Sequence, residues 1–301
     1  MTEGLVTVAP EVADALATGR PVVALETTLI SHGFPPGEGA AVGLESERLV
    51  RAAGAVPATV GVLEGTVRIG LGRAELERFS EAGAEARKVG PRDVAACAVQ
   101  GALGATTVGG TLAACRTAGI RFMGTGGLGG VHRGFPTPPD VSGDLAELAR
   151  TEVLVVCAGV KSLLDVPATG ELLETLGIPT LGWRTDELPL FYRARGGPPV
   201  SARVESAGEA AAVARAHWAL GRACAIVLAR PPDRSLDDIE PLLERAVTVA
   251  REQGVAGGAV TPFVLSFLHR ESDGRTLALN KELVAANAGL AAEVAAAYAD
   301  G

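Results

Sequence analysis

Three features of this 301-residue chain that could do chemistry each follow an apolar run typical of a buried strand. Glu26 is the last residue of one run, Lys161 lies two residues beyond another, and Thr125 follows the third and lies in a glycine-rich stretch. In open α/β sheets, ligands bind beyond the carboxyl ends of the strands. We therefore expect an acid, an amine and a glycine-rich segment to meet at one edge of a sheet. The runs are PVVALE (21–26), VLVVCAG (153–159) and IRFMG (120–124).

Glu26 closes its apolar run, so its carboxyl group is expected to be partly buried. Burial disfavours the charged form and raises the pKa of a carboxyl group. A raised pKa suits a proton donor that works near neutral pH. The alternative is a structural carboxylate that accepts hydrogen bonds from Thr27, Thr28 and Ser31.

Lys161 sits directly after a strand, where partial desolvation would leave a neutral amine able to attack a carbonyl carbon. The alternative is a lysine whose charged end reaches out of the sheet edge into water. Lys88 precedes a predicted helix start and could hold a phosphate, although a solvated loop lysine is the simpler interpretation of that residue alone.

The glycine-rich stretch, residues 124–134, reads GTGGLGGVHRG, and its first six letters satisfy G-x-G-x-x-G. A dinucleotide-binding turn also needs a helix at the loop and an acid at the end of the next strand. Prolines follow instead, no helix is expected before Asp144, and the next strand ends in CAG. The stretch could still hold an anion on its backbone N–H groups, beside His132 and Arg133. A tight turn without a ligand is the alternative.

Asp140 and Asp144 lie four residues apart with Ser142 between them. Their carboxylates could share a divalent cation, but Asp-x-Ser-x-Asp is more often a helix cap.

Two asparagines stand near the C-terminus. Asn280 is predicted to be a helix N-cap, and Asn287 lies seven residues on, on nearly the same helix face. A buried amide needs hydrogen-bond partners, so Asn287 either braces the core or meets the ligand.

Strand-like and helix-like segments alternate along the chain, which predicts a three-layer α/β/α fold with a central, mainly parallel sheet. We expect a single domain over residues 1–301, because strand and helix resume beyond the best candidate break at 193–204. The further expected strands are 58–64 and 66–70, joined as a hairpin at Gly65, then 179–183 and 223–229. The expected helices are 37–54, 73–83, 91–101, 106–119, 144–150, 169–177, 206–221, 235–254 and 280–300.

Composition excludes several classes of protein. Hydrophobic residues make up 48% of the chain, which supports a sizeable core, and the net charge of −8 argues against a nucleic-acid-binding surface. The cysteines form no C-x-x-C pair, which favours buried free thiols in a reducing compartment. No apolar run is long enough for a membrane helix, and the acidic N-terminus does not look like a signal peptide. We expect a soluble, cytoplasmic protein.

Taken together, several segments resemble the pseudouridine-5'-phosphate glycosidases, the indigoidine synthase A-like family. They occur in the family's order from about residue 6 to 299 and are specific only in combination. These segments are VALETTLISHG, PATVGVLEGTVRIGL, GATTVGGT, GTGGLGGVHRG, DVSGDLAEL, VVCAGVKSLLD, TPF and LNKELVAANAGLAAEVA.

The resemblance implies reversible cleavage of pseudouridine 5'-phosphate to uracil and ribose 5-phosphate, with a divalent metal, usually manganese, in a homotrimer. It implies that Glu26 is the general acid/base, that Lys161 is the covalent nucleophile, and that Asp140 anchors the metal. Implied substrate contacts are Lys88, Val108, Ser142, Gly143 and Asp144, with Thr125, His132 and Asn287 lining the site.

The sequence departs from the family pattern at 34–39, Gly90, Gly143 and Arg230. None of these changes removes a proposed catalytic group, but they bear on the contacts to the base and so on strict uracil specificity. A Schiff-base aldolase acting on a sugar phosphate would use the same lysine and acid, and a sugar kinase shares the layered architecture. A ligand-binding protein without activity is a further alternative.

Overall fold

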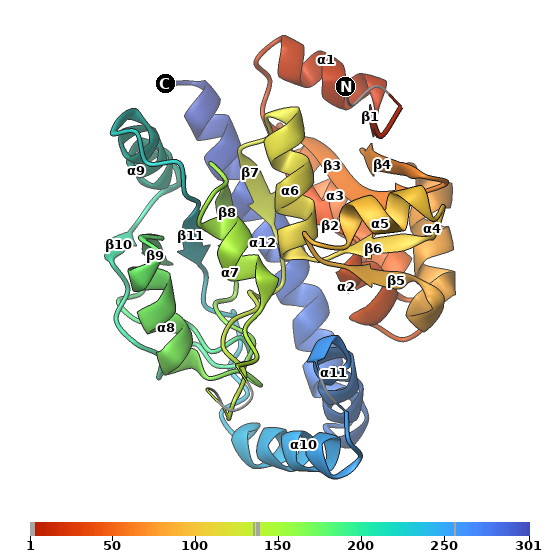
Figure 1. Ribbon diagram of the computed structural model, residues 1–301. Coiled ribbons are helices and arrows are strands. Elements are labelled where there is room, and N and C mark those ends of the chain that lie inside the picture. Colours follow the sequence, from red (N-terminus) through yellow and green to blue (C-terminus); the bar gives the residue numbers. More distant parts are fainter. Residues whose placement is uncertain (1–3, 135, 137–138, 256) are drawn as a thin grey trace.

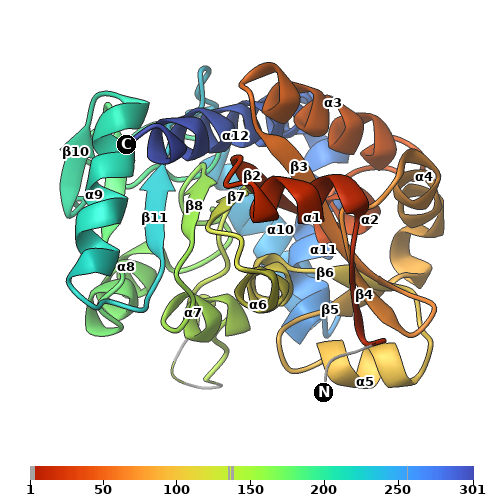
Figure 2. The same ribbon diagram turned by 90° about the horizontal axis from the view of Figure 1, so that it is seen from above.

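One mainly parallel sheet lies between two layers of helices (Figures 1 and 2). The computed structural model describes residues 4–134, 136, 139–255 and 257–301. The strands in these residues are β1 (Val6–Val8), β2 (Val22–Glu26), β3 (Val56–Leu63), β4 (Thr66–Ile69), β5 (Arg87–Val89), β6 (Gly104–Thr106), β7 (Phe122–Gly124), β8 (Leu154–Cys157), β9 (Thr180–Trp183), β10 (Ala202–Val204) and β11 (Ile226–Ala229).

The α-helices are α1 (Pro10–Ala17), α2 (Thr28–His32), α3 (Gly39–Ala52), α4 (Arg73–Ala82), α5 (Val94–Val99), α6 (Val108–Ala118), α7 (Gly143–Leu148), α8 (Val166–Thr175), α9 (Ala207–Ala219), α10 (Glu240–Glu252), α11 (Val260–Glu271) and α12 (Arg275–Ala299). Short 3₁₀ turns occupy Gly83–Glu85 and Gly257–Ala259. None of the described helices is long and apolar enough to cross a membrane.

The strand order is β1-β4-β3-β2-β7-β8-β11-β9-β10, and the pairings from β2 to β10 are all parallel. Antiparallel pairing occurs on the other side, where β3 and β4 form the expected hairpin. Glu64 and Gly65 in its turn both have positive φ, at 50° and 80°, as a two-residue hairpin turn requires. The neighbouring β5 and β6 were not predicted, because three-residue strands carry too few letters to show a pattern.

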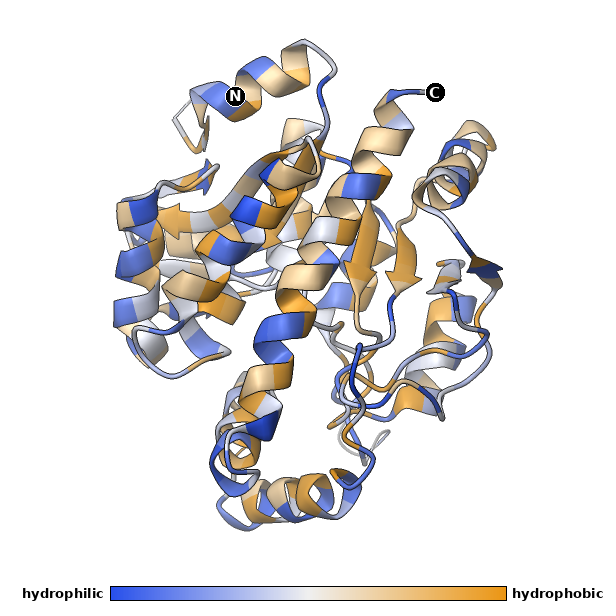
Figure 3. Ribbon diagram, turned by 180° about the vertical axis from the view of Figure 1, so that it is seen from behind, coloured by the Kyte–Doolittle hydropathy of each residue, from blue (hydrophilic) through white to orange (hydrophobic). Residues whose placement is uncertain are grey.

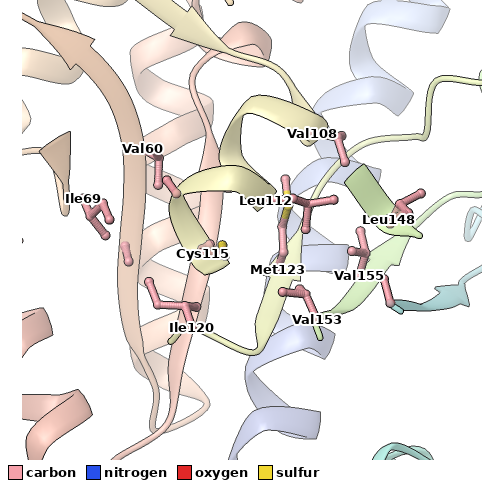
Figure 4. Close-up of a cluster of buried hydrophobic side chains, with 14 of the residues drawn as sticks. Val60, Ile69, Val108, Leu112, Cys115, Ile120, Met123, Leu148, Val153 and Val155 are labelled. Carbon is pink, nitrogen blue, oxygen red and sulfur yellow. The ribbon is translucent and has the colours of Figure 1, made fainter. Parts of the chain in front are cut away.

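Alternation along each strand divides the core into two layers. In β8, Val155 and Cys157 face a cluster with helices α1, α5, α6, α7 and α8, whereas Leu154 and Val156 face α3, α9 and α12. Figure 4 shows the first cluster, where Leu112 and Cys115 of α6 pack near Met123 of β7. Apolar colouring is strongest along the strands in Figure 3. The packing of helices on both faces of the sheet confirms the expected three-layer fold.

Several predicted helix starts were wrong. Helix α8 begins at Val166 rather than at 169, and helix α10 begins at Glu240 rather than at 235. Helix α5 begins at Val94 rather than at Pro91. Helix α12 begins at Arg275, so Asn280 is an interior residue and not an N-cap. Gly274, in the left-handed conformation, takes the capping position.

The glycine-rich stretch passes close to other parts of the backbone. A Cβ on Gly124 would lie 2.7 Å from the Cα of Ala288, and one on Gly127 would lie 2.6 Å from the Phe191 ring. These glycines have no positive φ. Close packing, rather than a special backbone conformation, therefore requires glycine at both positions.

Gly124→Ala should destabilise the protein by about 1–3 kcal/mol, because the added methyl group meets the backbone of α12 and not a movable side chain. Urea unfolding measures the change. Gly208→Ala is the matched control: it is exposed in α9 with no atom nearer than 4.0 Å to the new carbon, so a small gain in stability is expected. Equal stability of the two variants would contradict this account.

Candidate active site

Glu26 is buried at the end of β2, with 4% of its surface exposed. Desolvation is the main cause that raises the pKa of its carboxyl group from 4.5 to about 7. The positive charge of Lys161 and a hydrogen bond from the Thr125 hydroxyl oppose this rise. The acid is thus poised near neutrality, as expected from its place after an apolar run.

The hydroxyl groups that follow Glu26 do not bind its carboxyl group. Each donates instead to a backbone carbonyl: Thr27 to Val60 at 2.8 Å, Thr28 to Ala105 at 3.0 Å and Ser31 to Phe79 at 2.9 Å. The structural interpretation of Glu26 through these three residues was therefore wrong. Thr125, 99 positions away in the sequence, provides the contact.

The glycine-rich stretch extends β7 and runs beside the segment that follows β8. Thr125 N–H donates to the Val156 carbonyl at 2.9 Å, and Lys161 N–H donates to the Leu128 carbonyl at 3.2 Å. This pairing continues the parallel sheet beyond its regular strands. The pairing places Lys161, which is partly buried, on the side of Glu26. The positive charge of Lys161 lowers the pKa of the Glu26 carboxyl group.

Lys88 of β5 brings a second amine toward the same space. Burial is the main cause that lowers its pKa, and the charge of Lys161 adds to that effect. The carboxylates of Asp144 and Glu26 act in the opposite direction. Two amines and two acids from four segments therefore influence one another at the carboxyl edge.

Asp144 connects two of the predicted substrate-contact segments. One of its carboxylate oxygens accepts from Gly109 N–H at 2.8 Å and the other from Gly129 N–H at 3.1 Å. Val108 is buried at the first position of α6, directly before Gly109. The sequence analysis missed Gly109, because the contact is made by its backbone N–H group and glycine has no side chain that would indicate a binding role.

Ser142 caps α7, which begins at Gly143, because its hydroxyl accepts from Asp144 N–H at 3.2 Å. The helix-cap alternative for this motif is therefore confirmed. Both carboxylate oxygens of Asp144 accept hydrogen bonds from backbone N–H groups, and a cation shared with Asp140 stays a prediction.

His132 and Arg133 have different surroundings. His132 Nδ1 lies 3.7 Å from the Asp140 carboxylate, and burial is the main cause that lowers the pKa of the imidazole. Arg133 donates to the Ser162 carbonyl at 2.9 Å and to the Glu240 carboxylate at 3.1 Å. Arg133 thus connects the glycine-rich stretch to the segment after β8 and to the start of α10, and its part in anion binding stays a prediction.

Asn287 does brace the site. Its Nδ2 donates to the Thr125 carbonyl at 2.8 Å and to the Gly126 carbonyl at 3.4 Å. Thr125 in turn donates its hydroxyl to Glu26, so α12, the end of β7 and the acid form one connected unit. The Asn287 Oδ1 has no partner among the described residues.

Asp140 is the candidate metal ligand, with His132 beside it. Among the described residues, no group of three or more His, Cys, Asp or Glu side chains could hold a metal ion. A hard divalent cation can be bound through one carboxylate while it keeps several waters. The residues present fit such a water-rich site and not an all-protein cage.

Three of the four departures from the family pattern make contacts that the structure shows, and nothing in the structure explains Gly143. Gly90 N–H donates to the Asp93 carboxylate at 3.2 Å, and Arg230 pairs with Asp233 at 2.7 Å. In the segment 34–39, Glu38 forms an ion pair with Lys281 of α12 at 2.5 Å.

A surface hollow of about 360 Å³ lies away from the candidate site, because none of the candidate site residues lines it. Its lining residues are Arg184, Thr185, Asp186, Glu187, Ala194, Arg195, Arg203 and Pro231.

The fold and the site define an α/β/α protein whose sheet edge carries a buried acid opposite a lysine. More particularly, the chain belongs to the family of indigoidine synthase A like proteins, whose model matches residues 11–297.

Relatives named pseudouridine-5'-phosphate glycosidase match over nearly the full length. That of Herpetosiphon aurantiacus is 47% identical over 293 residues, 96% of each chain. That of Streptomyces griseus is 48% identical over 295 residues, covering 96% of this chain and 91% of the relative.

Solved structures agree. The prealnumycin C-glycosynthase AlnA, in complex with ribulose 5-phosphate, has a TM-score of 0.89 and 37% identity, covering 99% of this chain and 98% of that one. An indigoidine synthase A-like protein from Thermotoga maritima has a TM-score of 0.87 and 36% identity, covering 97% and 96%.

Glu26→Gln should stabilise the protein at pH 8 by about 3 kcal/mol. Above pH 4.5 the unfolded carboxyl group loses its proton while the folded one keeps it, which favours unfolding. This penalty grows up to pH 7, is complete above it, and disappears below pH 4.5. Urea unfolding at pH 4.5 and pH 8 measures the change, with exposed Glu81→Gln as the control. A gain that does not depend on pH would refute the assignment.

Proposed function

We propose that this protein reversibly cleaves the C–C glycosidic bond of pseudouridine 5'-phosphate, giving uracil and ribose 5-phosphate. The observation that carries the proposal is buried Glu26, with its pKa near 7, beside the charge of Lys161. The names of the full-length relatives and the sugar phosphate bound by AlnA support it.

A C–C glycosidic bond offers no leaving oxygen or nitrogen to protonate, so the usual pair of carboxylates does not suffice. The Lys161 amine attacks C1' as the C1'–O4' bond breaks, and the proton that the alkylated nitrogen loses is taken up by O4', which leaves a neutral secondary amine. Glu26 then protonates C5 of the base. The C1'–C5 bond breaks, uracil keeps the bonding pair, and the nitrogen lone pair forms a protonated imine at C1'. Water hydrolyses the imine and releases ribose 5-phosphate.

The remaining residues would bind and orient the substrate. Lys88 is a cation suited to the phosphate, and the segments of Val108 and 142–144 are joined through Asp144 beside it. Thr125 and Asn287 hold Glu26 and the end of β7 in place, and His132 lines the neighbouring wall. The proposal also includes a single catalytic domain, a homotrimer and a cytoplasmic location, which rest on the sequence and its resemblance.

Borohydride reduction with ribose 5-phosphate should trap one covalent adduct on Lys161, found by peptide mass spectrometry. The chain has only three lysines, Lys88, Lys161 and Lys281, so the site is unambiguous. Lys161→Ala should lose both the adduct and uracil release, whereas Lys281→Ala, which removes only the pair with Glu38, keeps both. Full activity of Lys161→Ala would overturn the mechanism.

The same experiment separates the alternatives. A Schiff-base aldolase would form the adduct without releasing uracil, and a sugar kinase would require ATP. A protein that only binds its ligand would give no turnover, and Lys161→Ala would leave its binding unchanged.

We further propose that Asp140 holds a divalent cation, manganese above others, which would neutralise negative charge on the substrate. Asp140→Ala should weaken Mn²⁺ binding at least tenfold, measured by the loss of free Mn²⁺ signal in electron paramagnetic resonance. Exposed Asp237→Ala serves as the control. Unchanged affinity in Asp140→Ala would exclude Asp140 as the ligand.

A further inference from the structure

Strand β3 changes its neighbour on one side at Val60. Up to Val60, the register partner of Glu26, β3 pairs with parallel β2. From Gly61 onward it pairs with antiparallel β6. The carboxyl ends of β2 and β6 therefore meet beside Val60.

Three threonines without exposed surface lie at this junction. The Thr27 hydroxyl donates to the Val60 carbonyl at 2.8 Å and accepts from Thr106 N–H at 2.9 Å. The Thr106 hydroxyl donates to the same carbonyl at 2.7 Å and lies 3.0 Å from the hydroxyl of Thr111 in α6. The Thr27 hydroxyl thus joins the chain that follows β2 directly to the backbone of β6.

The strands joined in this way carry different parts of the candidate site. Glu26 ends β2 and directly precedes Thr27. On the other side, β6 pairs with β5, in which Lys88 is the register partner of Ala105. Thr28 adds a second bond to β6, at the Ala105 carbonyl. The Thr27 hydroxyl therefore lies on the route from the buried acid to the strand that carries the Lys88 amine.

A hydroxyl at this place does more than fill space. Hydrogen bonds are directional, and a buried network whose members are paired holds one arrangement. The two partners of the Thr27 hydroxyl belong to different strands, so this group fixes the separation of the strand ends. A general acid must lie within hydrogen-bond reach of the atom that it protonates, which makes a fixed separation important for Glu26.

Lys161 lies outside this network. It follows β8, and its N–H donates to the Leu128 carbonyl at 3.2 Å. A change at Thr27 should therefore affect the proton transfer by Glu26 and not the formation of the imine on Lys161.

We infer that Thr27 is a positioning residue, whose hydroxyl holds the Glu26 carboxyl in place relative to a substrate bound at Lys88. The fully buried Thr27 side chain acts through Glu26 and not on the substrate itself. The inference rests on the proposed function and deepens it, because it assigns the alignment of the acid with the substrate to a residue that binds neither.

Thr27→Val tests this, because valine keeps the shape of threonine and removes the hydroxyl. The kcat for uracil release from pseudouridine 5'-phosphate should fall about tenfold or more, since a small displacement of a catalytic group is costly. The KM should change by less than about threefold, because Lys88 still binds the phosphate. Thr27→Ser keeps the hydroxyl and should retain at least about half of the wild-type kcat.

A second measurement separates positioning from general damage to the fold. Borohydride trapping of saturating ribose 5-phosphate on Lys161 needs no proton transfer to a base, so folded Thr27→Val should form the adduct as the wild type does. Damage to the fold would lower trapping and uracil release by the same factor. Thr27→Ala is a second variant without the hydroxyl if valine disturbs packing, with the same expected results.

Thr59→Val is the matched control. Thr59 is a buried threonine that directly precedes Val60 on β3, but its hydroxyl donates to Glu47 of α3 at 2.6 Å and not to the junction. Its substitution also removes a buried hydroxyl bond, yet the kcat for uracil release should stay close to that of the wild type.

A wild-type kcat in folded Thr27→Val or Thr27→Ala would overturn the inference and leave the proposed function standing. An equal loss of kcat in Thr59→Val or in Thr27→Ser would also overturn it, as would parallel losses of trapping and uracil release. If the wild type releases no uracil from pseudouridine 5'-phosphate, the proposed function itself fails and the inference fails with it.

Discussion

The hydrogen bond from Thr125 to Glu26 is the contact on which the candidate site depends, because it joins the ends of two neighbouring strands at a buried acid. Desolvation pushes the pKa of Glu26 upward, whereas this bond and the charge of Lys161 pull it back. Burial without them would leave an acid that stays protonated well above neutrality. A fully solvated carboxyl group would have no proton to donate at pH 7. The balance between the two effects gives a group suited to both giving and taking a proton.

Holding that balance requires close approach of several backbones. The Asn287 amide ties α12 to the Thr125 carbonyl, and Gly124 lets the same helix lie directly against β7. Asp144 does comparable work on the other side, because its carboxylate binds N–H groups of α6 and of the glycine-rich stretch. The glycines that first suggested a nucleotide loop therefore serve packing around the acid. Because these glycines have no side chains, α12 lies close enough to β7 for the Asn287 amide to reach the Thr125 carbonyl.

The sequence predicted the layered fold and the edge at which the candidate residues lie, because long apolar runs and their order along the chain carry that information. It could not predict that Thr125 rather than Thr27 reaches Glu26, since this depends on how β7 pairs with β2. The strands β5 and β6 were missed because three residues are too few to show a strand pattern, and without these strands Lys88 could not be placed near Lys161. Asn280 was mistaken for a cap because an asparagine after leucines looks the same at a helix start and inside one.

The distribution of unpaired polar atoms bears on what this edge of the molecule is for. The two apolar layers that enclose the sheet are well packed and contribute the stability, whereas Asn280, Tyr192 and Asn287 have buried polar atoms without partners among the described residues. A chain under pressure for stability alone would replace such groups by apolar ones at little cost in shape.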